Sequence, residues 1–283
     1  MHFLNVYHCY ENVGRLVRTL GETMPTPDTI DQSYRQAIAN VRPIAPPASS
    51  ATVSFEDGPW GQYLTETNLF EAIFVGVRAS SSDLRASWKS QVLEAQQYIR
   101  SLNEDLGRIM DLLVTDIVLL NTERTGGGSA SHIPGLVCIS PGPNWTMYDF
   151  AETLVHEAIH LNLFVADMLY GIYTLPTATL AEDQYRVLSA VKIGELRPLD
   201  KAFHSAVVAV PLMYMQDLRG ESTLVDLFTS SLRDCSTGLI DKREFFTDYG
   251  KMLVDQLHKF AMTLDYDYVA KSISSSEYAF YGH

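Results

Sequence analysis

Two histidines and a glutamate interrupt an otherwise apolar helical segment near the middle of the chain. Residues 146–168 repeat apolar side chains every three or four positions, which predicts a helix with one face in the core. Within it, His156-Glu157-Ala158-Ile159-His160 places three ionisable side chains among leucine, isoleucine and valine neighbours. Burying imidazoles and a carboxylate without compensation costs several kcal/mol, and a bound metal ion supplies that compensation. The sequence therefore predicts a metalloprotein organised around this helix.

The spacing of the two histidines suits a chelate. Residues i and i+4 of an α-helix lie on one face, so His156 and His160 can point ring nitrogens at one ion. Glu157 lies about 100° around the helix from His156, near enough to act on a water at the metal or to steady the ligands. The alternative is a chance HExxH pattern whose imidazoles are hydrogen-bonded in the protein interior.

Composition limits the class of protein. Hydrophobic residues make up 46% of the 283 residues and charged residues 19%, enough apolar material for a large core. The 21 Lys and Arg against 34 Asp and Glu give a net charge of −13, which repels phosphate backbones and argues against a nucleic-acid partner.

The N-terminus lacks the basic start and apolar run of a secretory signal, and no apolar stretch reaches the length of a membrane span. We therefore expect a cytoplasmic protein with no membrane partner. Three widely spaced cysteines, Cys9, Cys138 and Cys235, do not form a disulfide framework and are expected to be reduced, partly buried thiols.

The expected fold class is α+β, mainly helical with a small β-sheet, with the HExxH helix at the core of the site. Helical patterns cover 9–20, 29–41, 80–106, 146–168, 199–218, 222–234 and 241–264. Strand patterns cover 51–55, 69–77, 112–121 and 134–140, and the glycine-rich stretch 126–131 is interpreted as a flexible loop. We expect one enlarged catalytic domain over 1–283, with a helical N-terminal part (1–107), a metal-site core (108–220) and C-terminal helices with an aromatic tail (221–283).

The third metal ligand separates two enzyme classes. In a zinc metallopeptidase, Glu157 would be the general base, and a carboxylate downstream of the pair would complete the site. The candidates for that carboxylate are Asp167, Glu182 and Asp183.

A different candidate ligand is His204, nearly two turns into the helix that follows Arg197-Pro198. A single histidine on an apolar helix is more often a core residue, and a single arginine is usually a surface charge. Together, His204 and Arg197 indicate a metal with an anionic co-substrate, because guanidinium binds carboxylate in a bidentate fork.

Four stretches occur in an order that resembles a known family. They are Gly127-Gly128-Ser129, Pro134-Gly135-Leu136-Val137, Leu154-Val155-His156-Glu157-Ala158 with His160, and Arg197-Pro198-Leu199 with His204. The combination resembles the HExxH-motif peptide-modification proteins encoded beside ribosomally made peptide natural products, over roughly residues 110–220. Of a longer arginine- and proline-containing run in that family, this chain keeps only Arg197-Pro198.

The resemblance implies an iron(II)- and 2-oxoglutarate-dependent dioxygenase. It implies that His156, His160 and His204 bind iron and that Arg197 grips the distal carboxylate of 2-oxoglutarate. The expected reaction is hydroxylation of a side chain, at Cβ, of a ribosomally made precursor peptide, with Glu157 as an orienting group. Glu157 or Asp200 stays open as an alternative ligand.

Two other functions stay open: the zinc-dependent metallopeptidase and an inactive peptide-binding protein that keeps the fold. The tail from 265 to 283 carries five aromatic residues and is expected to pack on the body of the protein or on a second subunit, which allows a homodimer. The sequence identifies neither the peptide nor the residue that is modified.

Overall fold

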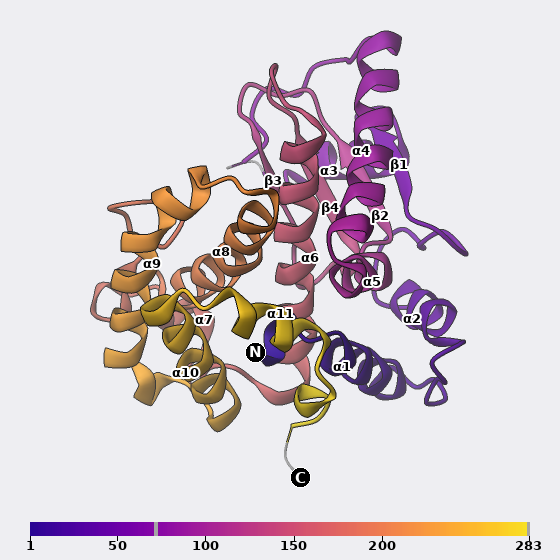
Figure 1. Cartoon of the computed structure of the whole chain (residues 1–283). Helices are drawn as coiled ribbons and strands as arrows, with labels where there is room; N and C mark the ends of the chain where they lie inside the picture. The colour runs from indigo at the N-terminus through magenta and orange to yellow at the C-terminus, as the bar shows by residue number, and fades with distance from the viewer. Residues whose placement is uncertain (71–72, 282–283) are drawn as a thin grey trace. The chain divides into compact units, whose positions relative to one another are not determined.

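The computed structural model describes residues 1–70 and 73–281 (Figure 1). Across these residues it has eleven α-helices, a four-stranded sheet and a two-stranded sheet. The predicted α+β class, mainly helical with a small sheet, is confirmed. No helix in this part of the chain is long and apolar enough to cross a membrane.

The chain divides into two compact units, and the positions of these units relative to one another are not determined. Residues 13–164 form the sheet unit, and residues 1–12 with 165–283 form the helical unit. Helices α1 (Val6–Thr19) and α6 (Met147–Tyr170) contribute residues to both. These boundaries differ from the three parts expected from the sequence, and a single catalytic domain stays a prediction.

The sheet unit is built on a mixed sheet with strand order β1-β2-β4-β3. Strands β1, β2 and β4 are parallel, and β3 runs antiparallel to β4 at the end of the sheet. The elements of this unit outside α1 and α6 are α2 (Ile30–Ala39), β1 (Thr52–Phe55), α3 (Pro59–Thr67), α4 (Ser82–Leu102), α5 (Glu104–Leu113), β2 (Asp116–Leu119), β3 (Gly126–Gly128) and β4 (Leu136–Ser140).

Both faces of the central strands are buried. On one face, Val118 and Cys138 belong to a hydrophobic cluster with Trp60 and Leu64 of α3 and with Phe74. Every residue of β2 and β4 is buried, as expected of parallel strands covered on two sides. The uninterrupted apolar runs in the sequence reflect this burial.

A buried ion pair holds the start of β2. Arg42 donates to Asp116, to the Thr115 hydroxyl at 2.8 Å and to the Pro134 carbonyl at 2.9 Å. The Arg42 side chain is fully buried and that of Asp116 nearly so. Breaking such a pair leaves an uncompensated buried charge, so it fixes the loop after α2 against two strands.

Several expected elements differ from the structure. The helix expected at 80–106 ends at Leu102, because the Asn103 side chain accepts from the Leu106 N–H and begins α5. The strand expected at 112–121 is shorter, since Leu112 and Leu113 belong to α5. The interpretation of 126–131 as a loop is wrong for Gly126–Gly128, which form β3.

The strand expected at 69–77 is not among the named strands of the described residues. Residues 71–72 of that prediction lie outside the described part of the chain. Near the end of the predicted strand, Gly76 has φ +69, a left-handed conformation that interrupts an extended run. Just after it, Arg78 makes a single antiparallel bridge with Asn121.

The helical unit contains most of the remaining helices. Its elements beyond the shared helices are η1 (His2–Leu4), α7 (Thr177–Leu180), η2 (Asp183–Tyr185), β5 (Val187–Leu188), β6 (Leu196–Arg197), α8 (Leu199–Arg219), α9 (Thr223–Asp241), η3 (Arg243–Phe245), α10 (Asp248–Thr263), α11 (Tyr266–Ser274) and η4 (Ser276–Tyr278). Helix α8 is buried along most of its length and packs against α9, α10 and α11.

The aromatic tail packs within the helical unit. The Asn5 side chain donates to the Ser272 carbonyl at 2.9 Å and to the Ser275 carbonyl at 2.8 Å, at the end of α11. The Tyr281 ring lies edge-on to those of Tyr170 and Tyr249. Packing of the tail on the body of the protein is therefore confirmed up to residue 281.

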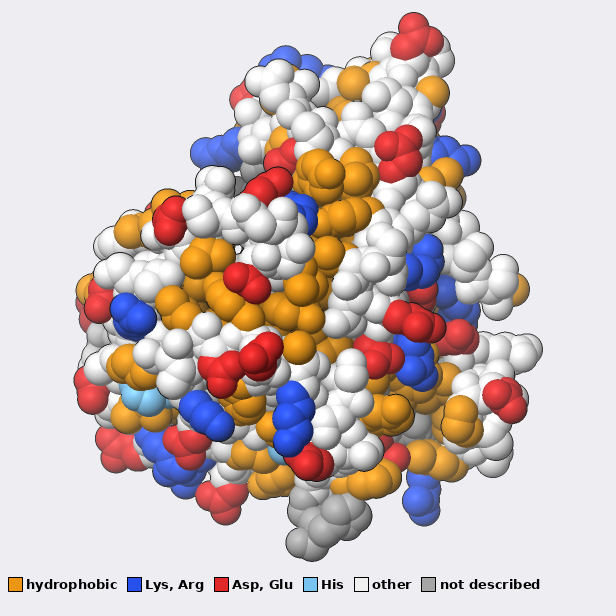
Figure 2. All heavy atoms as spheres, in the orientation of Figure 1, with side chains coloured by type: hydrophobic (Ala, Val, Ile, Leu, Met, Phe, Trp, Pro, Cys, Tyr) orange, Lys and Arg blue, Asp and Glu red, His pale blue; other side chains and the backbone are white. Residues whose placement is uncertain are grey.

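The three cysteines are free, as expected, and they are fully buried rather than partly buried. Acidic and basic side chains are interspersed with apolar and uncharged ones over the face drawn in Figure 2.

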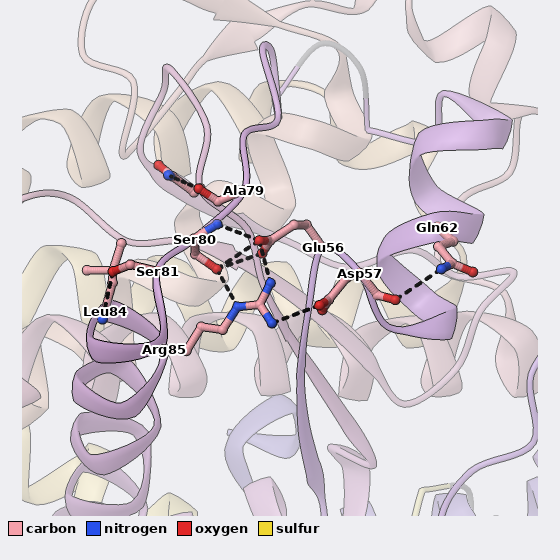
Figure 3. A network of polar contacts seen from close by, with 9 residues as sticks. Glu56, Asp57, Gln62, Ala79, Ser80, Ser81, Leu84 and Arg85 are labelled. Atoms are coloured by element: carbon pink, nitrogen blue, oxygen red, sulfur yellow. Dashed lines mark hydrogen bonds and ion pairs between the residues drawn. The ribbon is translucent and has the colours of Figure 1, made fainter.

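A closed polar network joins the end of β1 to the start of α4 (Figure 3). The Ser80 hydroxyl donates to both carboxylate oxygens of Glu56, at 2.9 and 2.8 Å, and Arg85 bridges Glu56 at 2.7 Å and Asp57 at 2.8 Å. Burial by itself raises the pKa of Glu56, but the hydrogen bonds from Ser80 and Arg85 outweigh it and leave that pKa below its usual value.

We predict that Glu56→Gln lowers the free energy of unfolding by about 1–2 kcal/mol at pH 7, because it removes the charge from these hydrogen bonds. A lowered folded-state pKa means that the stabilisation is complete above the ordinary pKa of about 4.3 and disappears as the pH falls through the lower value. Urea unfolding from pH 7 to pH 3 should show the free energies of unfolding of the wild type and Glu56→Gln becoming equal at low pH. Glu66→Gln, an equal charge change at an exposed position of α3, should have little effect at any pH; a constant Glu56→Gln deficit down to pH 3 contradicts the prediction.

Candidate metal site

The two histidines of the motif converge on one point. They lie one turn apart in the middle of α6, and the His156 and His160 Nε2 atoms are 3.1 Å apart. Two metal–nitrogen bonds of about 2.1 Å spanning that distance subtend about 95°, between octahedral and tetrahedral values. Without an ion, one imidazole must donate its Nε2–H to the other. The pair therefore fits two ligands of one metal ion.

Burial keeps His156 in the form that binds metals. The side chain retains 26% of its surface exposed, yet the protein packed around it lowers the pKa of His156 to about 4. At neutral pH the imidazole is uncharged, and it keeps one nitrogen lone pair that can bind a cation.

Glu157 lies beside the histidine pair and is almost completely buried. Its Oε1 is 4.0 Å from His156 Nε2, and its Oε2 accepts a hydrogen bond of 2.7 Å from the Ser129 hydroxyl. Burial raises the pKa of Glu157 to about 7, while the bond from Ser129 acts in the opposite direction. A cation bound by the histidines would favour the ionised carboxylate.

Strand β3 approaches α6 closely because Gly127 has no side chain. A Cβ atom there would lie 2.6 Å from Glu157 Oε1 and 2.9 Å from Thr153 Cγ2, closer than real Cβ contacts. This approach brings Ser129 within reach of Glu157. Sequence reasoning did not identify Gly127 or Ser129 as site residues, and the only signal was the run of three glycines followed by serine.

The other predicted site residues belong to the helical unit. His204 is buried on α8, and Asp200 lies one turn before it on the same face. The Asp200 Oδ1 atom is buried and has no hydrogen-bond partner among the described residues. A buried carboxylate oxygen without a partner is costly, so Asp200 has unused capacity to bind a donor or a cation.

Arg197 precedes α8 and pairs with Val187 in the small sheet. It is half-buried and makes no ion pair or side-chain hydrogen bond with the described residues. Its guanidinium is therefore available to an anion, unlike that of Arg186, which pairs with Asp183.

The three carboxylates considered for a zinc peptidase also belong to the helical unit. The Asp167 carboxylate accepts from the Ile172 N–H at 2.6 Å. Burial raises the pKa of Asp167, and the nearby Asp200 carboxylate raises it further, whereas the hydrogen bond from Ile172 lowers it. Glu182 accepts from Gln184 at the surface, and the Asp183 side chain is fully exposed.

The structure thus brings together His156, Glu157 and His160 within the sheet unit. His204, Arg197 and Asp200 lie in the helical unit, and their positions relative to the histidine pair are not determined. Within the described residues, no three His, Cys, Asp or Glu side chains are arranged to hold a metal ion. The identity of the third ligand stays a prediction.

We predict that Gly127→Ala lowers stability by about 1–3 kcal/mol, because the new methyl group displaces Glu157 from Ser129. Gly128→Ala is the matched control: a Cβ there meets Ile73 Cδ1 at an ordinary 3.4 Å, so this variant should lose less than about 1 kcal/mol. Chemical unfolding measures both.

A double mutant tests the cause of that loss. Adding Gly127→Ala to Glu157→Ala should cost much less than adding it to the wild type, because the colliding carboxylate is gone. Equal costs in the two backgrounds contradict the clash.

Comparison with protein-family models finds no match, and comparison with curated proteins finds none either. The resemblance to HExxH-motif peptide-modification proteins therefore rests on the motifs described above, with the histidine pair as the feature that the structure places in detail.

Proposed function

We propose that this protein is a cytoplasmic iron(II)- and 2-oxoglutarate-dependent hydroxylase that modifies a side chain, at Cβ, of a ribosomally made precursor peptide. The observation that carries the proposal is the convergence of the His156 and His160 Nε2 atoms at 3.1 Å beside a buried carboxylate.

In this proposal His156 and His160 bind the metal from α6, and His204 of α8 is the third ligand. Asp200 is the alternative third ligand, since its Oδ1 atom is buried without a partner. Three protein ligands leave positions for a chelating 2-oxo acid and for O₂.

Arg197 binds the distal carboxylate of 2-oxoglutarate. The support is a half-buried guanidinium with no partner among the described residues, directly ahead of the helix that carries His204. A planar guanidinium makes two parallel hydrogen bonds to a carboxylate, which fixes both position and orientation.

Iron(II) with 2-oxoglutarate and O₂, when bound, supplies the oxidation of an unactivated C–H bond to an alcohol. Glu157, held by Ser129, contributes a fixed negative charge and acceptor beside the histidine pair. No proton transfer by Glu157 is needed for hydroxylation.

One observation favours a second candidate, a zinc-dependent peptide hydrolase. Glu157 is adjacent to the histidine pair, and burial raises its pKa to about 7, a value suited to a general base near neutral pH. Zinc, when bound, supplies a Lewis acid for hydrolysis. In that reaction Glu157 would take the proton of the attacking water and deliver it to the leaving amine.

We predict that anaerobic titration of metal-free protein with iron(II) and then 2-oxoglutarate produces a saturable visible charge-transfer absorption. Arg197→Ala should weaken 2-oxoglutarate binding by at least tenfold, the loss of one charge-assisted bidentate contact. Lys192→Ala removes an exposed cation of the same hairpin that pairs with Glu195, and it should leave the titration unchanged.

Three outcomes contradict this prediction in different ways. Iron binding without the absorption, together with zinc-dependent cleavage of peptides that Glu157→Gln abolishes, indicates the hydrolase. No binding of either metal by folded protein, with peptide binding retained, indicates an inactive binding protein. Wild-type 2-oxoglutarate affinity in Arg197→Ala refutes the assignment of Arg197 alone.

A further inference from the structure

Strand β3 forms one edge of the four-stranded sheet, beside the candidate site. The Leu120 N–H donates to the Ile139 carbonyl, so Ile139 faces β2 within the sheet. Backbone groups of successive strand residues alternate in direction, so Ser140 and Cys138 face β3 and bond to Gly126 and Gly128.

It follows that the N–H and C=O of Gly127 face away from β4. Among the described residues β4 is the only strand that pairs with β3, and none of them bonds to these two groups. An edge strand with unpaired groups is a template for an added strand.

The side-chain direction at Gly127 connects this edge to the chemistry. The missing side chain of Gly127 points at Glu157 and Thr153 on α6, and Glu157 lies 4.0 Å from the His156 Nε2 atom. A residue directly opposite Gly127 on an added strand would have its side chain on the same face of the sheet, whichever direction the strand runs. That residue would lie on the face of the sheet that carries α6 and its histidine pair.

The neighbouring residues of an added strand would face the other side of the sheet. There a Cβ at Gly128 would lie 3.4 Å from Ile73 Cδ1 and 3.6 Å from the rings of Phe70 and Phe74, and Phe74 also lines a cavity of about 290 Å³. Leu64, Leu69 and Leu120 contribute apolar surface to this cavity, which has room for an apolar side chain.

We propose that β3 binds the substrate peptide as an added strand. The residue to be modified lies opposite Gly127, and an adjacent apolar side chain occupies the cavity beside Phe74. The assignment of the residue opposite Gly127 as the one modified rests on the proposed function, whereas the docking mode itself needs no metal. The recognised substrate is an extended peptide with an apolar residue next to the reacting one.

The test uses metal-free protein labelled with ¹⁵N-glycine and observes the Gly127 amide by NMR. The probe is the blocked pentapeptide Thr-Leu-Ala-Leu-Thr, and the matched probe carries an N-methyl group on the central alanine. We expect a saturable shift of the Gly127 amide with a Kd on the order of 1 mM. N-methylation should weaken binding by about tenfold, because one strand hydrogen bond is lost.

The cavity is tested separately by filling it. Val77→Trp places a large side chain in the cavity from an exposed lining residue, and Val41→Trp is the control at an exposed position outside it. Val77→Trp should weaken the leucine peptide severalfold and leave Thr-Ala-Ala-Ala-Thr unaffected.

The proposal is overturned if the Gly127 amide does not shift at the highest soluble peptide concentration. It is also overturned if the N-methylated peptide binds as tightly as the unmodified one. Equal effects of Val77→Trp and Val41→Trp overturn the assignment of the cavity. The peptide titration contains no metal and is therefore independent of iron binding. If the peptide shifts the Gly127 amide but the protein does not bind iron, only the proposed function is refuted. If the protein binds iron but the peptide does not shift the Gly127 amide, only the docking mode is refuted.

Discussion

The close contact between β3 and α6 determines the arrangement of the candidate site. Gly127 lets the strand lie directly on Glu157, and that approach brings the Ser129 hydroxyl to the same carboxylate. A buried carboxylate has few conformations available once one oxygen is hydrogen-bonded and a backbone occupies the space beside the other. The orientation of Glu157 beside the histidine pair is therefore a consequence of one missing side chain on the strand.

Buried polar groups elsewhere in the sheet unit are arranged differently. Arg42 with Asp116, and Glu56 with Arg85 and Ser80, are closed networks in which opposite charges meet. Their role is structural, because each fixes a loop or helix start against the sheet. Among the described residues Glu157 accepts from one hydroxyl and has no Lys or Arg partner, and burial lowers the pKa of the adjacent His156 to about 4, so that this imidazole is uncharged at pH 7. An acid without a cation partner beside two convergent imidazoles distinguishes the histidine pair from those networks, and the proposed metal site rests on this difference.

The sequence predicted the parts of this arrangement that depend on local periodicity. The helix around His156 and His160 was predicted because its apolar residues repeat with helical spacing, and strand β4 because of its apolar run. Strand β3 was missed because glycines have little strand propensity, and its conformation depends on pairing with β4 and on the approach to Glu157. The break at Asn103 could have been predicted, since asparagine followed by two acidic residues is a common helix start.

The relation of Arg197 and His204 to the histidine pair could not be derived from spacing, because they belong to a different compact unit. The two units share one local arrangement. Asp200 and His204 lie one turn apart on α8, as His156 and His160 do on α6. Through its other oxygen Asp200 pairs with Lys201 at 3.4 Å, so the carboxylate already has a cation partner within its own unit. Its buried Oδ1 atom remains without a partner among the described residues, one turn from His204, and this atom is what makes Asp200 the alternative to His204 in the proposed function.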